Sequence, residues 1–337
     1  MQGKVSSKPN AAPVYVGVDV CKEWLDIHLH PLGRDLRLAN GKAGLQALKR
    51  LLRGLQPASI VMEATGKFHR LAHRSLHESG FPVAIVDPYR ARMFARACGH
   101  LAKTDRLDAR FLAILAQMQQ PTPTAPPDKL LETLGELVNA RSAAAADLTA
   151  HKNRLKATDS DFLRKQLGKL VMALQRHIES LDKEIALRIT DDPELCRRVE
   201  ILTSVPGVGT VTAYSLIVGL SELGQCNAKQ AAMLAGLAPI ANDSGARQGQ
   251  RSIRGGRKAP RNALYMAALS ACRYNPDMKI FATRLKDRGK QAKVVLTAVM
   301  RKLVVLANTL LAENRCWTPK SALTFNTDAH PGARAIR

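Results

Sequence analysis

The order of strand-like and helix-like segments in the first 120 residues is the feature that most constrains how this chain can fold. Three runs, VYVGVDVC, WLDIHLHP and RDLRLANG, follow one another with only short turns between them, which is typical of an antiparallel meander. Helix and buried-strand patterns then alternate: a helix over residues 42–55, the strand SIVMEA, a helix over residues 68–78, the strand PVAIVDP and two more helices. This order predicts a mixed α/β sheet.

Four acidic residues stand where such a sheet could bring them together. Asp19 ends the run VYVGVD, Glu63 ends the run IVME, and Asp105 and Asp108 lie one helical turn apart in KTDRLDAR. The segment order is that of an RNase-H-like sheet, in which two strand-end carboxylates and two from one helix face can converge on a pair of Mg²⁺ ions. Each residue alone could be a turn, cap or surface ion-pair residue. Together the four favour a metal site, whereas Asp26, in an alternating strand, is expected to face solvent.

The charge of the chain indicates a polyanionic partner. Lys and Arg total 51 against 28 Asp and Glu, a net charge of +23. The excess lies in residues 1–120, at +9, and in residues 200–337, at +13, while the part between them carries +1. Such a balance is typical of nucleic-acid binding. Aromatic residues make up only 4%, so base stacking on aromatic platforms is not expected to be the main binding mode.

Cysteine usage and hydropathy bear on the compartment. The six cysteines show no CxxC pairing, so neither a zinc site nor a disulfide framework is predicted, and a reducing cytoplasm fits. We find no signal peptide, and we expect no apolar stretch long enough to span a bilayer.

A long helical region is predicted after the Pro-rich segment QQPTPTAPPD, residues 119–128. About sixty residues then continue without proline until Pro193. Apolar residues recur there at steps of three or four, which is typical of a coiled coil or helical hairpin: Leu167, Leu170, Leu174, Ile178, Leu181, Ile185 and Ile189. Self-association is favoured over an amphipathic helix that packs only within the monomer.

The segment ILTSVPGVGTVTAYSLIVGL has the form helix, PGVG turn, helix. Backbone N–H groups at Gly207 and Gly209 could bind a phosphate, as in helix-hairpin-helix motifs that hold the DNA backbone. A PGVG turn can also simply pack two helices together.

Residues 244–276 carry no acidic residue, and several glycines make their first part a flexible loop. The cations of this stretch are candidates for nucleic-acid binding: Arg247, Arg251, Arg254, Arg257, Lys258 and Arg261. One hydroxyl, that of Ser244, stands at the start of the loop beside Asp243, which could orient the loop. Among cations a serine can act as a nucleophile toward phosphate, although most loop serines only cap and turn.

These motifs, taken in order, resemble one family. VGVDV, VMEATG, KTDRLDAR, SVPGVG and DSG…GQRSIRGGR are similar to the DEDD transposases of the insertion sequence 110 family, which includes Piv-type DNA invertases and bridge-RNA-guided recombinases. The resemblance covers about residues 14–317. One departure is Phe68, where the family commonly has tyrosine.

The resemblance implies a fold, a chemistry and partners. It implies a RuvC-like (RNase-H-like) domain, a coiled coil and a mainly α transposase domain with the helix-hairpin-helix-like motif. The tetrad Asp19, Glu63, Asp105 and Asp108 would bind Mg²⁺, and Ser244 would attack DNA to form a phosphoserine ester. A bridge RNA would pair with donor and target double-stranded DNA, and the protein would act as a homodimer or homotetramer. The expected segments are an arm (1–13), the RuvC-like domain (14–120), the coiled coil (121–195), the transposase domain (196–317) and a tail (318–337).

Two other functions are compatible with the residues. A RuvC-like Holliday-junction resolvase or nuclease would use the tetrad with water and would not need Ser244. A non-enzymatic RNA-binding scaffold would be expected to have a broken tetrad, and here all four acidic residues are present.

Overall fold

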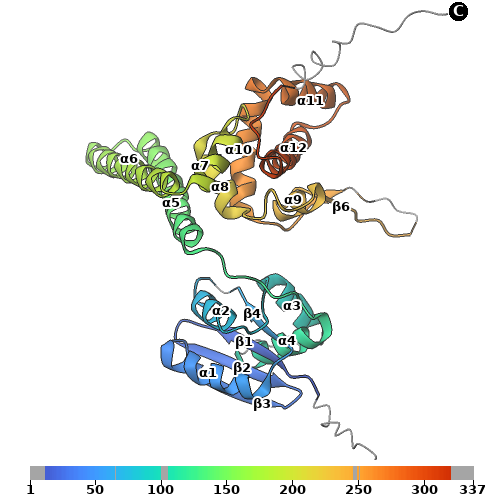
Figure 1. Cartoon of the computed structure of the whole chain (residues 1–337). Coiled ribbons are helices and arrows are strands. Elements are labelled where there is room, and N and C mark those ends of the chain that lie inside the picture. The colour runs from blue at the N-terminus through green and yellow to red at the C-terminus, as the bar shows by residue number, and fades with distance from the viewer. Residues whose placement is uncertain (1–11, 65, 100–104, 246–248, 250, 320–337) are drawn as a thin grey trace, which may run out of the picture. The chain divides into compact units, whose positions relative to one another are not determined.

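A computed structural model describes residues 12–64, 66–99, 105–245, 249 and 251–319, with only the backbone described at 105 and 106. The chain forms two compact units, Met1–Pro127 and Asp128–Arg337, which are described separately below (Figure 1).

The first unit is built on a five-stranded sheet in the order β3-β2-β1-β4-β5. β1 pairs with β2 and β2 with β3 in antiparallel fashion, whereas β1 with β4 and β4 with β5 are parallel. The predicted three-stranded meander and the two strands predicted after it are therefore confirmed. The strands are β1 (Tyr15–Val20), β2 (Trp24–His30), β3 (Arg34–Ala39), β4 (Ser59–Glu63) and β5 (Val83–Val86).

Helices cover both faces of this sheet, as the alternation of buried residues requires. α1 (Lys42–Leu55) and α2 (His69–His77) bury Leu48 and Leu76 against one face, where they meet Val16 and Val18 of β1. α3 (Pro88–Ala97) and α4 (Asp105–Gln119) pack against the opposite face, which presents the odd-numbered positions of β1. Figure 1 shows α1 and α4 on opposite sides of the sheet.

The Pro-rich segment after α4 remains attached to the first unit. Thr124 receives a hydrogen bond through its carbonyl oxygen from the ring of His73 (2.7 Å), and its backbone N–H donates to the carbonyl of Val83 (2.8 Å). The segment therefore covers the outer edge of β5, where unpaired strand groups would otherwise be exposed. The two units divide at its end, after Pro127.

The helical middle of the chain is a hairpin of two long helices, α5 (Lys129–Ala157) and α6 (Asp161–Thr190) (Figure 1). Ser160 ends the connection by capping α6, with its hydroxyl accepting from Leu163 N. Arg141 of α5 donates two hydrogen bonds to the carboxylate of Asp182 on α6. The expected apolar stripe is buried at Ile185 and Ile189, where the hairpin joins the second unit's core.

The rest of the second unit is a helical core with one small β-hairpin. The PGVG turn joins α7 (Pro193–Thr203) to α8 (Thr210–Gly219), which confirms the predicted helix, turn and helix. The other elements are α9 (Ala228–Leu234), β6 (Pro239–Ile240), β7 (Ser252–Ile253), α10 (Lys258–Tyr274), α11 (Pro276–Asp287) and α12 (Ala292–Ala312).

α12 corrects the expectation that no stretch of the chain could span a bilayer. By length and composition this helix is apolar enough to do so. Its apolar residues, however, form the middle of the helical core, with Val299, Leu303, Val304 and Leu310 fully or almost fully buried. A core helix passes the same test, and 44% of the apolar window of α12 is buried within the protein.

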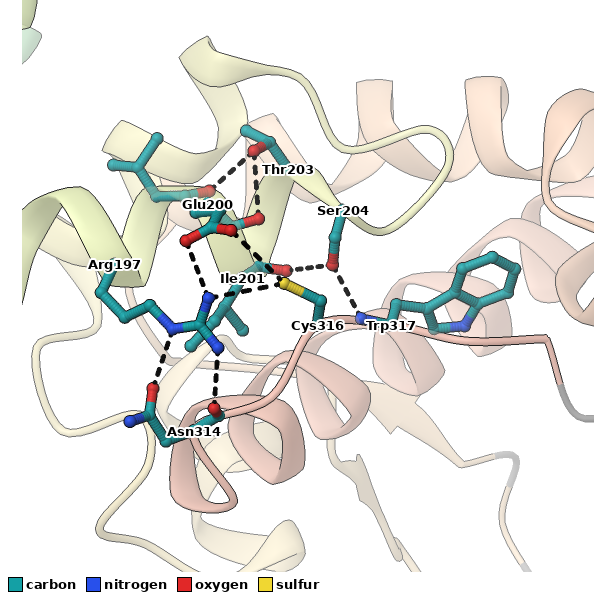
Figure 2. A network of polar contacts seen from close by, with 9 residues as sticks. Arg197, Glu200, Ile201, Thr203, Ser204, Asn314, Cys316 and Trp317 are labelled. Carbon is teal, nitrogen blue, oxygen red and sulfur yellow. Dashed lines mark hydrogen bonds and ion pairs between the residues drawn. The ribbon is translucent and has the colours of Figure 1, made fainter. Parts of the chain in front are cut away.

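The segment after α12 returns to α7 through a polar network (Figure 2). The guanidinium of Arg197 donates to the side-chain oxygen of Asn314 (3.1 Å), to the Asn314 carbonyl (2.9 Å) and to Glu200 (2.7 Å). Ser204 accepts a hydrogen bond from the backbone N–H of Trp317 (2.8 Å). The hydrogen bond from Arg197 to Glu200 raises the pKa of the arginine. These bonds fix the end of α12 against the start of the core.

Candidate active site

Asp19 and Glu63 lie beside each other at the ends of two neighbouring parallel strands. β1 and β4 are paired from Tyr15 with Ser59 to Val18 with Met62, and the two acidic residues come next on each strand. Both occupy positions on the face that α4 covers, and both are half-buried. The two strand ends that carry these acidic residues are therefore neighbours in the sheet.

Gly17 allows α4 to cross β1 closely. A Cβ at this position would fall well inside contact distance of the Ala109 carbonyl oxygen and the Ala113 nitrogen. Any other residue would hold the helix away from the sheet. The close crossing places the first turn of α4, which carries Asp108, near the strand ends.

Asp108 and Glu63 line one cavity of about 240 Å³. Arg92 of α3 lines the same cavity, so a cation faces the acidic residues. Asp105 is the first residue of α4, and its side chain lies outside the described part of the chain. The structure therefore brings three of the four predicted acidic residues to one face of one unit.

The donor set fits a hard divalent ion by its chemistry, because carboxylate oxygens are the ligands that Mg²⁺ prefers. Within the described residues, no three acidic, histidine or cysteine side chains are close enough to hold an ion. The carboxylate of Asp105, one turn before Asp108, belongs to the set that the sequence predicts.

Asp26 was expected to face solvent, and that expectation is wrong. It is directly opposite Asp19 in the β1–β2 ladder and is only 7% exposed. Arg37 of β3 is next in the same row and donates two hydrogen bonds of 2.9 Å to its carboxylate. The neighbouring row contains His28, which is bonded to Asp35 at 2.6 Å.

The pattern WLDIHLH already shows which residues of β2 lie on the same face as Asp26. Its alternation shows that Asp26 and His28 share the face opposite Leu25 and Ile27. The polar residues of that face predict exposure to solvent, but α4 covers the face. Ala109 of α4 lines a cavity of about 330 Å³ together with Asp26 and Arg37. The register of Asp26 with Asp19 was the feature of the sequence that could have indicated a role for this polar face.

Ser244 lies in the connection between β6 and β7 and is exposed. Asp243 accepts a hydrogen bond from the backbone N–H of Gly249 (3.0 Å), so it ties the two sides of this connection together. At the other end of the hairpin, a Cβ at Gly256 would clash with the backbone of Gly236, which shows how closely the chain after β7 crosses the end of α9. The hairpin thus presents Ser244 from a fixed base.

The predicted nucleic-acid-binding cations differ in their surroundings. Arg257 forms an ion pair with Glu222 and donates to the Gly219 carbonyl, while Arg261 donates to the Gly255 carbonyl. Burial raises the pKa of Glu222, but the hydrogen bonds and charge of Arg257 outweigh it and the pKa lies below its usual value. Arg257 and Arg261 therefore also stabilise the base of the hairpin.

Of the remaining predicted cations, Arg251, Arg254 and Lys258 are exposed, and Arg247 lies outside the described residues.

The two glycines of the PGVG turn have different roles in the structure. Gly207 has a φ of 100° and lies so close to Ala271 of α10 that a Cβ would clash with its backbone, so it packs α10 against the turn. Gly209 is the N-cap of α8, and a Cβ there would meet no atom within 4 Å. Only at Gly209 is the backbone open in the way that a phosphate site needs.

Two family models match the chain over more than half of its length. A transposase model for the DEDD group of insertion sequence 110 matches residues 16–158, and a model described as transposase of the IS116/IS110/IS902 family matches residues 199–282. The first range contains the acidic residues and the second contains the PGVG turn and Ser244.

Similar proteins agree with these matches. The pilin gene-inverting proteins of Moraxella bovis and Moraxella lacunata are each 28% identical over 313 residues, which is 89% of this chain and 96% of those proteins. An uncharacterized 42 kDa protein of insertion element IS900 from Mycobacterium paratuberculosis is 33% identical over 151 residues, 42% of this chain and 35% of that protein. The chain therefore belongs to the insertion sequence 110 family of transposases and is a DNA-recombining enzyme.

Proposed function

We propose that this transposase cuts and exchanges DNA strands by a Mg²⁺-dependent attack of Ser244 that leaves a phosphoserine ester. The observation that carries the proposal is the placement of Asp19 and Glu63 at adjacent strand ends, on the face where α4 brings Asp108. The order β3-β2-β1-β4-β5 supports assignment of this unit to the RuvC-like (RNase-H-like) class.

Asp19, Glu63, Asp105 and Asp108 would hold the metal ions. When bound, Mg²⁺ supplies charge that stabilises the attacking and leaving oxygens of a phosphodiester displacement. The protein's own contribution would be to bring Asp19, Glu63 and Asp108 to the face of the sheet that α4 covers. Arg92 lines the same cavity as Glu63 and Asp108 and places a positive charge beside these two carboxylates.

Ser244 would form the covalent link. Its hydroxyl gives its proton to solvent water, a bond forms between Oγ and phosphorus, and the phosphorus–oxygen bond to the departing strand breaks. That strand leaves with the electron pair and takes up a proton as a free hydroxyl. The hydroxyl of another strand then attacks the phosphoserine, so the phosphodiester is restored and Ser244 is released without any external energy source.

The choice of DNA sites is proposed to lie with a bridge RNA that pairs with donor and target DNA. The acid-free stretch from Ser244 to Pro276 and the low aromatic content support binding to nucleic-acid backbone. The family resemblance supports a homodimer or homotetramer in the cytoplasm, and the exposed leucines of α6 described below support self-association.

A denaturing gel for covalent protein–DNA adducts tests the proposal. Purified protein is mixed with Mg²⁺, donor and target DNA, and RNA transcribed from the flanks of the element. We expect an adduct that requires RNA and Mg²⁺ and that disappears in Ser244→Ala and in Asp105→Ala. Ser270→Ala, which changes a serine of α10 in the same unit, is the matched control and should form the adduct normally.

The alternative is a RuvC-like resolvase or nuclease that uses water. It predicts cleavage without an adduct, unchanged in Ser244→Ala and lost in Asp105→Ala. That result would remove Ser244 from the mechanism and leave the carboxylate site in place.

A further inference from the structure

A groove of about 660 Å³ runs between the β6–β7 hairpin and α12 in the second unit. One wall comes from the base of the hairpin, with Pro239 and Ile253, and the other from one side of α12, with Val294 and Ala298. Figure 1 shows α9 and β6 passing beside α12. This groove plays no part in the mechanism proposed above.

The groove combines an apolar floor with a basic rim. Ile253 is 38% exposed and Val294 46% exposed, so apolar surface is open to water along its length. None of the described residues that line the groove is acidic. Four of them carry a positive charge: Arg251, Lys293, Arg301 and Lys302. Lys302 lies over the ring of Phe281 at 4.2 Å, which fixes its charge at the groove wall.

Charge complementarity identifies the kind of occupant. Lys293 and Arg301 are eight residues apart on α12 and are therefore on one side of the helix, about 12 Å apart along its axis. A polyanionic strand can meet both charges along that line. The apolar floor of the groove can contact the faces of nucleic-acid bases. Bases expose these faces only where they are unpaired, so the occupant that fits is a single strand.

The groove is close in the chain to the proposed nucleophile. Pro239 lines it and Ser244 is five residues further on, so at most about 18 Å of extended chain separates them. That length corresponds to about five stacked nucleotides of one strand. On the other side of the hairpin, Arg251 lines the groove two residues after Gly249, whose N–H bonds to Asp243.

We propose that this groove binds an unpaired stretch of the DNA strand that Ser244 attacks, with the bases against the apolar floor and the phosphates on Lys293 and Arg301. The placement of the strand relative to Ser244 rests on the function proposed above, whereas binding of unpaired DNA in the groove does not. Opening the duplex beside the cut would hold the strand ready for exchange.

The test uses full-length protein carrying Ser244→Ala, so that chemistry does not enter the measurement. Affinity for a fluorescein-labelled single strand of about twelve nucleotides is measured by anisotropy at several salt concentrations. We expect Lys293→Gln with Arg301→Gln to weaken binding about tenfold and to lower the salt slope by about 1.4, as two lost phosphate contacts predict. The matched control, Lys279→Gln with Lys286→Gln on α11, removes the same charge outside the groove and should change affinity less than about twofold.

A second pair of variants tests the apolar floor. Ile253→Ser should reduce the preference for single-stranded over double-stranded DNA, whereas Ile280→Ser, at an exposed isoleucine of α11 outside the groove, should not. Photocrosslinking of a strand containing 5-iododeoxyuridine, followed by peptide mapping, should mark Phe281 or the segment 293–305 in protein with no groove substitution.

Three outcomes would overturn the proposal. Equal losses of affinity in the groove pair (Lys293 and Arg301) and in the control pair (Lys279 and Lys286) would show that only net charge matters. Crosslinks confined to other segments would place the strand elsewhere. Groove variants that bind DNA normally but sediment as a smaller species would show that the groove receives a second copy of the chain. Failure of the adduct assay, by contrast, would leave this binding result unaffected.

Discussion

Asp26 and Asp19 face each other across the β1–β2 ladder, where cross-strand side chains are about 5 Å apart. Two carboxylates at that distance repel each other, and Arg37 balances one of them through its paired hydrogen bonds to Asp26. The side chain of Asp26 is therefore held by Arg37, and the guanidinium offsets part of the negative charge that Asp26 places opposite Asp19.

We expect Asp26→Asn to raise the Mg²⁺ concentration needed for half-maximal cleavage about tenfold, a cost of about 1.4 kcal/mol. The substitution leaves the positive charge of Arg37 near Asp19 without the carboxylate that neutralises it, and a nearby cation opposes metal binding. Adding Arg37→Met should return the Mg²⁺ requirement toward that of the unmodified protein. The measurement is a Mg²⁺ titration of strand cleavage.

Arg34→Met is the control for this charge effect. Arg34 is on the same strand as Arg37, but its side chain lies on the opposite face of the sheet, where its cross-strand partner is Leu29. Its loss should leave the Mg²⁺ requirement unchanged. If the double variant required as much Mg²⁺ as Asp26→Asn alone, charge balance at Asp19 would not be the role of the pair.

At the scale of elements, the packing of α4 on β1 sets the position of Asp108 relative to Asp19 and Glu63. The contact is made at Gly17, where the helix backbone comes closer than a side chain would allow. A helix displaced there would carry Asp105 and Asp108 away from Asp19 and Glu63. Catalysis is sensitive to such shifts of even 1 Å.

We expect Gly17→Ala to reduce cleavage at least about a hundredfold and to destabilise the first unit by about 1–3 kcal/mol, as overpacking usually does. Cleavage assays and urea unfolding at the same temperature measure the two effects. Gly54→Ala is a matched control, because Gly54 lies in α1 and a Cβ there meets nothing within 4 Å. It should be active, and more stable by about 0.5–1 kcal/mol. Normal cleavage by Gly17→Ala would show that α4 can shift without loss of the site.

At the scale of the whole molecule, the α5–α6 hairpin leaves apolar surface uncovered in the single chain. Its stripe is buried at Ile185 and Ile189, but Leu170 is 48% exposed, and Leu163, four residues before the first leucine of the stripe, is also 48% exposed. Leu187 is on the same helix outside the stripe and is 56% exposed. A second copy of the chain could cover the open part of the stripe.

We expect Leu163→Glu with Leu170→Glu to raise the dissociation constant of the homo-oligomer at least about a hundredfold. Two leucines that lose about 1.5 kcal/mol of burial each account for this change. Analytical ultracentrifugation over a range of concentrations measures it, and Leu187→Glu should associate normally. A chain that sediments as a monomer at every concentration, without substitutions, would contradict self-association through this stripe.

The strands and helices of the first unit could be predicted from local patterns alone. The helix predicted over residues 42–55 is α1, and the five strand patterns correspond to β1 to β5. The position of Asp19 and Glu63 at two strand ends followed from the same information, because each closes an apolar run, and the structure adds that these two strands are parallel neighbours. The PGVG turn was located correctly, but its two glycines could not be distinguished without knowing that α10 packs on Gly207.

The sequence by itself determined the elements, their order and the residue types of the site, because periodicity and strand ends depend on neighbours a few positions away. The tertiary structure decided what covers each face. Asp26 was predicted to face solvent because its polarity could not reveal that α4, about eighty positions later, packs over it. The groove beside β6 likewise depends on α12, which lies some fifty residues further along the chain. Burial is a property of packed elements, and only the folded chain brings those elements together.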